Sequence, residues 1–243
     1  MATNGDRPGV HPPNEQYLEV ILILEEEGNQ VIQARLAERV GHSAPTVSEM
    51  VHRLKEAGYI NVHGRALSLT QSGRELATSV IRKHRLAERL LIDVIGLEWH
   101  KVHAEADRWE HVISDDVEAR LSMVLGNPSI CPHGNVIPGS GAVRTPASVL
   151  TEAQIGDRVT LVRVAEALEF DSEALLYLER NGFIPGRSAT VVAKGPDESL
   201  VLETDETSLV LGEHLARLLY YVPCAEDNGA GSATGPRSLQ VTR

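Results

Sequence analysis

Two short stretches of this 243-residue sequence are unusually rich in imidazole and carboxylate side chains. Between residues 102 and 111, four such side chains recur at helical spacing, and an α-helix would place them within one arc of about 100°. These are His103, Asp107, Glu110 and His111. Upstream, His84 and Glu88 lie four residues apart and therefore share one face of their own helix. Amphipathic helices usually bury Leu and Val on such a face, so the pattern predicts a site for a divalent metal ion.

The elements ahead of these stretches follow a helix-turn-helix pattern. Apolar residues repeat at helical spacing in three segments, and two strand-like segments then alternate around a turn at 63–65. The predicted helices are 14–26, 33–39 and 43–57, with Asn14 and Ser43 as N-caps, and the predicted strands are 59–62 and 66–69. Three helices followed by a β-hairpin are typical of a winged helix-turn-helix, a reader of double-stranded DNA.

The third predicted helix would enter the major groove of DNA. Its first residues are small or carry a hydroxyl group, so they can approach base edges and phosphates closely. The candidates for DNA contact are Ser43, Ala44, Pro45, Thr46 and Ser48, with Arg65 at the tip of the hairpin. A winged helix that binds protein instead of DNA is the alternative.

The charge of the chain argues against simple nucleic-acid binding. The formal net charge is −11, and residues 14–70 hold five Lys and Arg against eight Asp and Glu. DNA-binding domains usually carry a basic footprint. Either this segment does not bind DNA, or bound cations and locally placed basic residues offset its acidity.

Three further helices are predicted at 70–93, 99–114 and 115–125. Their apolar surface exceeds what one winged helix needs, which favours a homodimer, and a two-fold dimer would read a palindromic operator. The following loop contains Cys131 and His133, which could ligate a metal, although a structured turn is the simpler explanation.

The last part of the chain changes to short β-strands around one helix at 172–180, which predicts a small SH3-like β-barrel. The strand-like segments are 159–162, 189–193, 200–203 and 208–211. The fold class is therefore mainly α with a small β domain. The expected division is a disordered N-terminus at 1–13, the winged helix-turn-helix at 14–73, a helical metal-binding and dimerisation domain with a linker loop at 74–145, the SH3-like domain at 146–223 and a disordered tail at 224–243.

Composition excludes several classes of protein. The sequence has no run of 18 apolar residues and no signal-peptide core near its start, so no membrane partner is expected. Its two cysteines are far apart and predict no disulfide framework, which fits the cytoplasm.

Several of these segments resemble the diphtheria toxin repressor family of metal-dependent regulators. The resemblance lies in residues 43–48, 82–91, 102–111 and the loop 127–138, and it extends from about Tyr17 to Pro223. It implies a dimeric repressor whose divalent metal co-repressor favours the DNA-binding arrangement.

The resemblance also implies two ligand sets. One set comprises His84, Glu88 and His103, completed by the SH3-like domain, where the aligned stretch offers Asp171 and Glu173. The other set comprises Asp107, Glu110 and His111 with a ligand from the first helix, for which Gln16 is the candidate. Glu19, one turn further on, would add a carboxylate as in manganese-responsive members, or is a solvated surface charge. Metal at this second set would tie the first helix to the helices that carry residues 84–111.

The second set departs from the iron-responsive members, which commonly place Met and Cys where this chain has Gln16 and Asp107. Oxygen donors suit Mn²⁺, whereas thiol and thioether groups suit iron, cobalt or nickel. Mn²⁺ is therefore the favoured co-repressor, with Fe²⁺ second. A metal-independent DNA-binding scaffold is an alternative from another class. An enzyme would need a base such as Glu105, which points about 160° away from the centre of the ligand arc, so no catalytic activity is expected.

Overall fold

The computed structural model describes residues 12–224. The segments predicted to be disordered, 1–13 and 224–243, lie outside it except at their inner ends. The N-terminal domain has three helices and a hairpin, as the sequence predicts. They are α1 (Pro12–Glu26), α2 (Gln33–Val40), α3 (Ala44–Glu56), β1 (Ile60–His63) and β2 (Ala66–Leu69). Helix α1 begins two residues before the predicted cap at Asn14, because proline is compatible with a first helical turn.

Local chemistry explains where the reader helix starts. Gly41 ends α2 in the left-handed region at φ 68°. Two residues later, the Ser43 hydroxyl accepts a hydrogen bond from the Thr46 amide at 3.4 Å, which caps α3 as predicted. The apolar face of α3 is buried in the core of the N-terminal domain, whereas its first turn is exposed.

The middle domain is helical. Helix α4 (Gln71–Leu90) starts at a Thr70 cap and ends in a π-helical turn, Leu91–Ile95. A 3₁₀ turn, Trp99–Lys101, precedes α5 (Val102–Trp109), and Ser114 caps α6 (Asp115–Val124). The predicted helix 99–114 is thus shorter, and His111 lies in the turn that follows α5.

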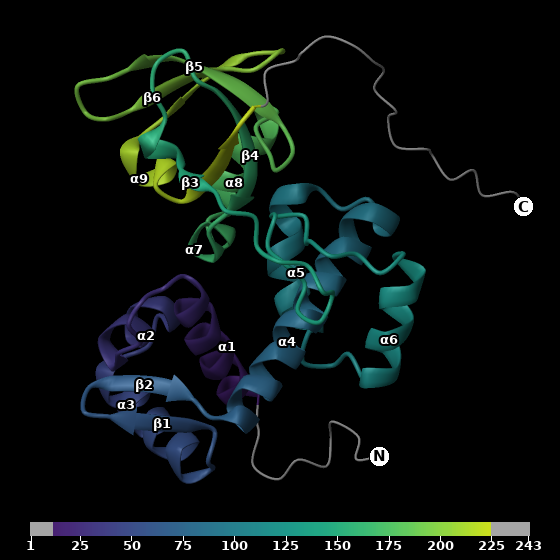
Figure 1. The fold of residues 1–243 in the computed structure, drawn as a ribbon. Coiled ribbons are helices and arrows are strands. Elements are labelled where there is room, and N and C mark those ends of the chain that lie inside the picture. The colour runs from purple at the N-terminus through teal and green to yellow at the C-terminus, as the bar shows by residue number, and fades with distance from the viewer. Residues whose placement is uncertain (1–11, 225–243) are drawn as a thin grey trace, which may run out of the picture.

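The C-terminal domain is a six-stranded antiparallel sheet with the order β3-β8-β4-β5-β6-β7, which curves around a core of its own (Figure 1). The strands are β3 (Ser148–Val149), β4 (Arg158–Val164), β5 (Ser188–Lys194), β6 (Leu200–Glu203), β7 (Ser208–Leu211) and β8 (Leu219–Pro223). Helix α8 (Ser172–Arg180) has the predicted bounds. The short helices α7 (Glu166–Glu169) and α9 (Glu213–Ala216) and the strands β3 and β8 were not predicted.

The β domain is docked on the helical domain rather than tethered to it. The indole of Trp99 joins the core of the β domain, and its Nε1 donates to the Pro132 carbonyl at 3.0 Å. Glu179 of α8 accepts from the Trp99 amide at 2.8 Å. Helix α7 lies between the sheet and the N-terminal domain, beside α5 (Figure 1). Within residues 12–224, no helix is long and apolar enough to cross a membrane.

Candidate metal centre

Helices α4 and α5 pack together and bring the two predicted ligand faces into contact. His84 Nε2 of α4 lies 3.0 Å from His103 Nδ1 of α5 and 3.2 Å from Glu88 Oε1. The grouping of His84, Glu88 and His103 therefore agrees with the first predicted ligand set.

Two side chains from outside these helices complete a group that we call the inner cluster: His84, Glu88, His103, His133 and Glu169. His133 comes from the loop after α6, and its Nδ1 lies 2.9 Å from Glu88 Oε1. Glu169 comes from α7, and its Oε2 lies 3.0 Å from His103 Nδ1. Glu88 and His133 are 0% exposed and Glu169 is 3% exposed. The cluster thus joins the helical domain, the loop and the β domain in a water-poor interior.

Three polar side-chain atoms of the inner cluster have no hydrogen-bond partner. They are Glu88 Oε2, His103 Nε2 and His133 Nε2, and all three are buried. Leaving a buried polar atom unpaired costs about 1–3 kcal/mol, so three in one place need an explanation. The Cys131 thiol also lies with Glu88 and His133 in a group whose ligand atoms are all within 4.8 Å. Imidazole, carboxylate and thiol groups are the ligands of divalent transition metals, so these residues fit a metal ion.

The charges of the inner cluster are strongly coupled. Burial alone would lower the pKa of His103, but its hydrogen bonds with Glu169 and Glu88 outweigh burial and raise that pKa to about 10. The Glu88 pKa is held well below its usual value, since the charges of His133 and His84 outweigh burial. Because metal ions bind the neutral imidazole, a metal ion and protons would compete for these side chains.

The residues of the second predicted ligand set line a cavity of about 420 Å³ between α1 and α5. Four of them lie near His84 of the first set and form with it a group that we call the outer cluster: Glu19, His84, Asp107, Glu110 and His111. His84 Nδ1 lies 2.6 Å from Glu110 Oε2 and 3.4 Å from Asp107 Oδ1. His111 Nε2 lies 3.2 Å from Glu110 Oε1. His84 thus presents one ring nitrogen to each cluster, whereas the sequence analysis assigned it to the first set alone.

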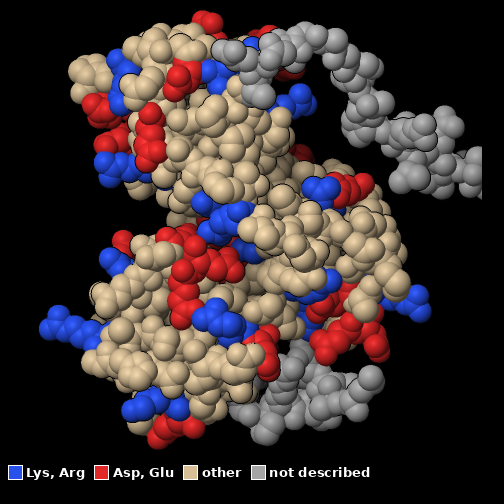
Figure 2. Space-filling view, in the orientation of Figure 1, with Lys and Arg blue, Asp and Glu red and all other residues tan. Residues whose placement is uncertain are grey.

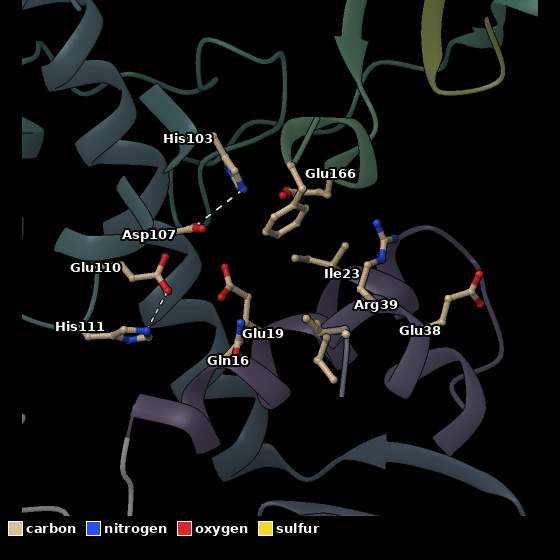
Figure 3. A pocket seen from close by; sticks show the side chains of 14 residues that line it. Gln16, Glu19, Ile23, Glu38, Arg39, His103, Asp107, Glu110, His111 and Glu166 are labelled. Carbon is tan, nitrogen blue, oxygen red and sulfur yellow. Dashed lines mark ion pairs between the residues drawn. The ribbon is translucent and has the colours of Figure 1, made fainter. Parts of the chain in front are cut away.

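Helix α1 brings its acidic turn to the outer cluster (Figure 3). A carboxylate oxygen of Glu19 lies within 4.8 Å of ligand atoms of His84 and Glu110, so Glu19 is not a solvated surface charge. Burial, and next the Glu110 charge, raise the pKa of Glu19 well above its usual value. Gln16 is exposed at the rim of the cavity. The sequence analysis missed Glu15, whose Oε2 lies 2.8 Å from His111 Nδ1.

The prediction of Asp171 as a ligand is corrected by the structure. Asp171 Oδ1 accepts from the Ala174 amide at 3.0 Å, so this exposed carboxylate caps α8, and Glu173 is exposed in the next turn. The β-domain carboxylates at the site are Glu169 and Glu166, because the unpredicted helix α7 turns them towards α5. Glu166 is buried, lines the outer cavity and pairs with the Arg85 guanidinium.

The loop around His133 is the predicted structured turn, and it also supplies a cluster residue. The Gly134 amide donates to the Cys131 carbonyl at 3.0 Å. Gly134 has φ 89°, and a Cβ there would lie 2.0 Å from the Val162 carbonyl oxygen. The close approach of the loop to β4 places His133 beside Glu88.

The predicted DNA-contact residues share an open surface. Ser43, Ala44, Pro45, Thr46 and Ser48 are exposed at the start of α3, and Arg65 is exposed at the tip of the hairpin. Many acidic side chains of the domain lie elsewhere. Some belong to the outer cluster, and three at the C-terminal end of α1 form ion pairs with arginines. The pairs are Glu25 with Arg74, Glu26 with Arg144 and Glu27 with Arg39. Figure 2 shows acidic side chains gathered in the hollow between the N-terminal domain and the rest of the molecule.

Comparison with known proteins assigns this chain to a family. Residues 11–66 match the model of the iron-dependent repressor N-terminal DNA-binding domain, and residues 70–139 match the model of the metal-binding and dimerisation domain of the same repressors. The chain belongs to the iron-dependent repressor family. Residues 149–222 match the FeoA domain, which accounts for the SH3-like β domain of this repressor.

Its relatives are named for two metals. The iron-dependent repressor IdeR of Mycobacterium tuberculosis is 48% identical over 189 residues, which cover 73% of this chain and 82% of that protein. The diphtheria toxin repressor of Corynebacterium diphtheriae is 56% identical over 126 residues, covering 51% and 56%. A solved structure of a manganese-dependent transcriptional repressor in complex with manganese has a TM-score of 0.76 at 35% identity, covering 87% of this chain and all of that one. The chain is thus a metal-dependent transcriptional repressor with a DNA-binding and a dimerisation domain.

Proposed function

We propose that Mn²⁺ is the co-repressor of this protein and that it binds at the outer cluster. The supporting observation is the donor set, in which carboxylates and imidazoles surround the cavity and Gln16 adds an amide at its rim. Hard oxygen ligands suit Mn²⁺ better than they suit softer metal ions. Fe²⁺ is the second candidate, because the relative at 48% identity is named for iron.

Glu19, Asp107, Glu110 and His111 would hold the metal at the outer cluster, with His84 and Gln16 at its edges. The inner cluster would hold a second ion through His84, Glu88, His103 and Glu169, with His133 and Cys131 beside it. A divalent cation supplies positive charge that cancels the repulsion between the carboxylates.

The outer cluster sits between two domains. Glu15 and Glu19 belong to the DNA-binding domain, whereas Asp107, Glu110 and His111 belong to the dimerisation domain. The pKa of Glu19 is raised by burial and next by the Glu110 charge, so the charged form of this carboxylate is disfavoured where α1 meets α5. The occupancy of this site would therefore decide how firmly α1, and with it the domain that carries the reader helix, is held against the dimerisation domain.

In a dimer, the two reader helices would meet a palindromic operator at half-sites spaced by about 34 Å or a multiple of it. The contacts would come from Ser43, Ala44, Pro45, Thr46 and Ser48, with Arg65 on the backbone. We place this activity in the cytoplasm, where the chromosome of a bacterial relative lies.

Replacing the two oxygen donors should change the metal preference. In the Gln16→Met/Asp107→Cys double variant, thioether and thiol replace amide and carboxylate, so the ratio of Mn²⁺ to Co²⁺ affinity should fall by about tenfold or more. Calorimetric titration of the two metals, with air-stable Co²⁺ as the stand-in for Fe²⁺, measures this ratio. A ratio unchanged from the wild type would contradict the assignment of the outer cluster as the selective site.

A charge on the exposed apolar surface of the dimerisation domain should separate the protomers. Val112 is 78% exposed after α5, and Val94 is 61% exposed in the π-helical turn that contacts α5. Val112→Asp should yield a monomer in sedimentation equilibrium and lose operator binding, because a buried unpaired charge is strongly unfavourable at an interface. Val210→Asp, at a 56% exposed position of β7, is the matched control and should stay dimeric. A dimeric Val112→Asp protein would place the interface elsewhere.

A further inference from the structure

A hydrogen bond inside the N-terminal domain connects the acidic turn of α1 to the start of the reader helix. Tyr17 directly follows Glu15 and Gln16, and it is 0% exposed in the core of the domain. Its hydroxyl lies 2.7 Å from Nδ1 of His42, and the two rings are 5.8 Å apart. His42 itself is exposed and immediately precedes Ser43, the cap of α3.

The turn that contains His42 also forms part of the outer cavity. Val40 and Gly41 line that cavity together with Gln16 and Glu19. The backbone amide of His42 donates to the Ala37 carbonyl at 3.3 Å, which is longer than a typical N–H···O bond. The Tyr17 hydroxyl therefore holds this turn at His42 in addition to the backbone hydrogen bonds to the Ala37 carbonyl.

We infer that Tyr17 is a positioning residue, which transmits the occupancy of the outer cluster to the reader helix through its hydrogen bond with His42. The inference rests on the proposed function, because it requires the metal-dependent placement of α1. A buried hydroxyl must keep a partner, and a 2.7 Å contact leaves little room for independent movement. When Glu15 and Glu19 draw α1 towards α5, His42 and the Ser43 cap must follow Tyr17.

Chain geometry supports this route. Tyr17, which holds the turn, lies only two residues from Glu15 and two residues from Glu19 on α1. The three residues therefore occupy about one turn of the helix. The reader helix begins two residues after His42. A small displacement of α1 would therefore move the N-terminal end of α3, which carries the proposed DNA contacts.

Tyr17→Phe and His42→Ala test this coupling. Phenylalanine keeps the buried ring and removes only the hydroxyl, and His42→Ala removes the partner of that hydroxyl from the exposed side. The DNA affinity of each full-length variant is measured with Mn²⁺ and with a chelator, on a labelled duplex selected from random sequences by the Mn²⁺-loaded wild type. Calorimetry gives the Mn²⁺ affinity without DNA, and urea unfolding checks the fold.

Each single variant should lower the DNA affinity of the Mn²⁺-loaded protein by about fivefold or more, within the usual range of coupling between two sites. The affinity without metal and the Mn²⁺ affinity without DNA should not change. The double variant should be no weaker than either single one, because both remove the same bond. His42→Gln, which keeps an acceptor near the hydroxyl, should recover part of the loss. Tyr59→Phe, in the same core near the hairpin, is the control and should resemble the wild type.

Two results would overturn the inference. In the first, the ratio of the DNA affinity with Mn²⁺ to that without Mn²⁺ is the same in Tyr17→Phe and in His42→Ala as in the wild type. The other is an equal loss of affinity with and without Mn²⁺, which would make the hydrogen bond a structural contact only. A wild-type protein with no metal effect would instead reject the proposed function, so the two failures are distinguishable.

Discussion

The Glu110→Gln variant is expected to lose metal-dependent DNA binding, with an apparent Mn²⁺ affinity lower by about 100-fold or more. Glu110 is buried and is the only carboxylate among the described residues that contacts both His84 and His111, at 2.6 and 3.2 Å. Glutamine keeps the size of the side chain but removes the charge that a divalent cation requires. It also removes the nearer of the two carboxylates beside Nδ1 of His84, because Asp107 Oδ1 lies further away, at 3.4 Å.

Glu105→Gln is the matched control for this variant. Glu105 lies on the same helix, α5, but accepts hydrogen bonds from Trp109 Nε1 at 2.9 Å and from Arg108 at 2.8 Å instead of facing the cavity. Calorimetric titration with Mn²⁺ and fluorescence anisotropy with a labelled duplex should give wild-type values for the control. Wild-type Mn²⁺ affinity in Glu110→Gln would contradict the assignment of Mn²⁺ binding to the outer cluster.

The Glu88→Gln variant should be the most destabilised of the cluster variants in the absence of metal. Glu88 is fully buried, and its Oε1 lies within 3.4 Å of nitrogens of His84, His103 and His133. Removing one partner from a buried set of charges costs about 3–5 kcal/mol, because the remaining charges are left uncompensated. The same change should prevent Mn²⁺ from stabilising the contact between the β domain and the helical domain.

Urea unfolding with and without Mn²⁺ measures both effects. Glu173→Gln, on the exposed first turn of α8, is the control and should unfold like the wild type. The raised pKa of His103, about 10 against an ordinary value of 6.5, gives a further check. A raised histidine pKa stabilises the folded state at low pH, and this contribution declines as the pH rises from about 6.5 towards 10. In Glu88→Gln this decline should be smaller, and equal stability of variant and wild type would contradict the charge-coupled cluster.

Features set by short stretches of sequence were predictable. Helix α8 has the predicted bounds because its apolar period and its Asn181–Gly182 stop are local signals. Ser43 caps α3 as expected for the same reason. The predicted ligands on α4 and α5 could be grouped from the sequence because four-residue spacing on a helix defines a face before any tertiary contact forms.

Features set by contacts between distant segments were not predictable in this way. His133 and Glu169 join residues 45 and 66 positions away in the chain, and no local period marks them as neighbours of Glu88 and His103. Asp171 was chosen from the family resemblance, but its carboxylate caps the first turn of α8. Trp99 was assigned to a helix, yet it packs in the core of the β domain.

The acidity of the chain, which argued against DNA binding, has a spatial explanation. Glu15 and Glu19 face the outer cluster and the carboxylates at the end of α1 are paired with arginines, whereas the first turn of α3 carries hydroxyl groups. Net charge describes the whole domain, but the reader surface is only one part of it.

The central claim is that the occupancy of the outer cluster controls DNA binding. The most direct test is the fluorescence anisotropy of a labelled duplex, selected from random sequences by the Mn²⁺-loaded full-length protein, titrated with that protein in Mn²⁺ and then in excess chelator. The account predicts an affinity for the duplex that is about 5- to 150-fold higher with Mn²⁺ than with chelator, and restored when Mn²⁺ is returned. Equal affinity in both conditions, or a selection that enriches no sequence, would contradict it.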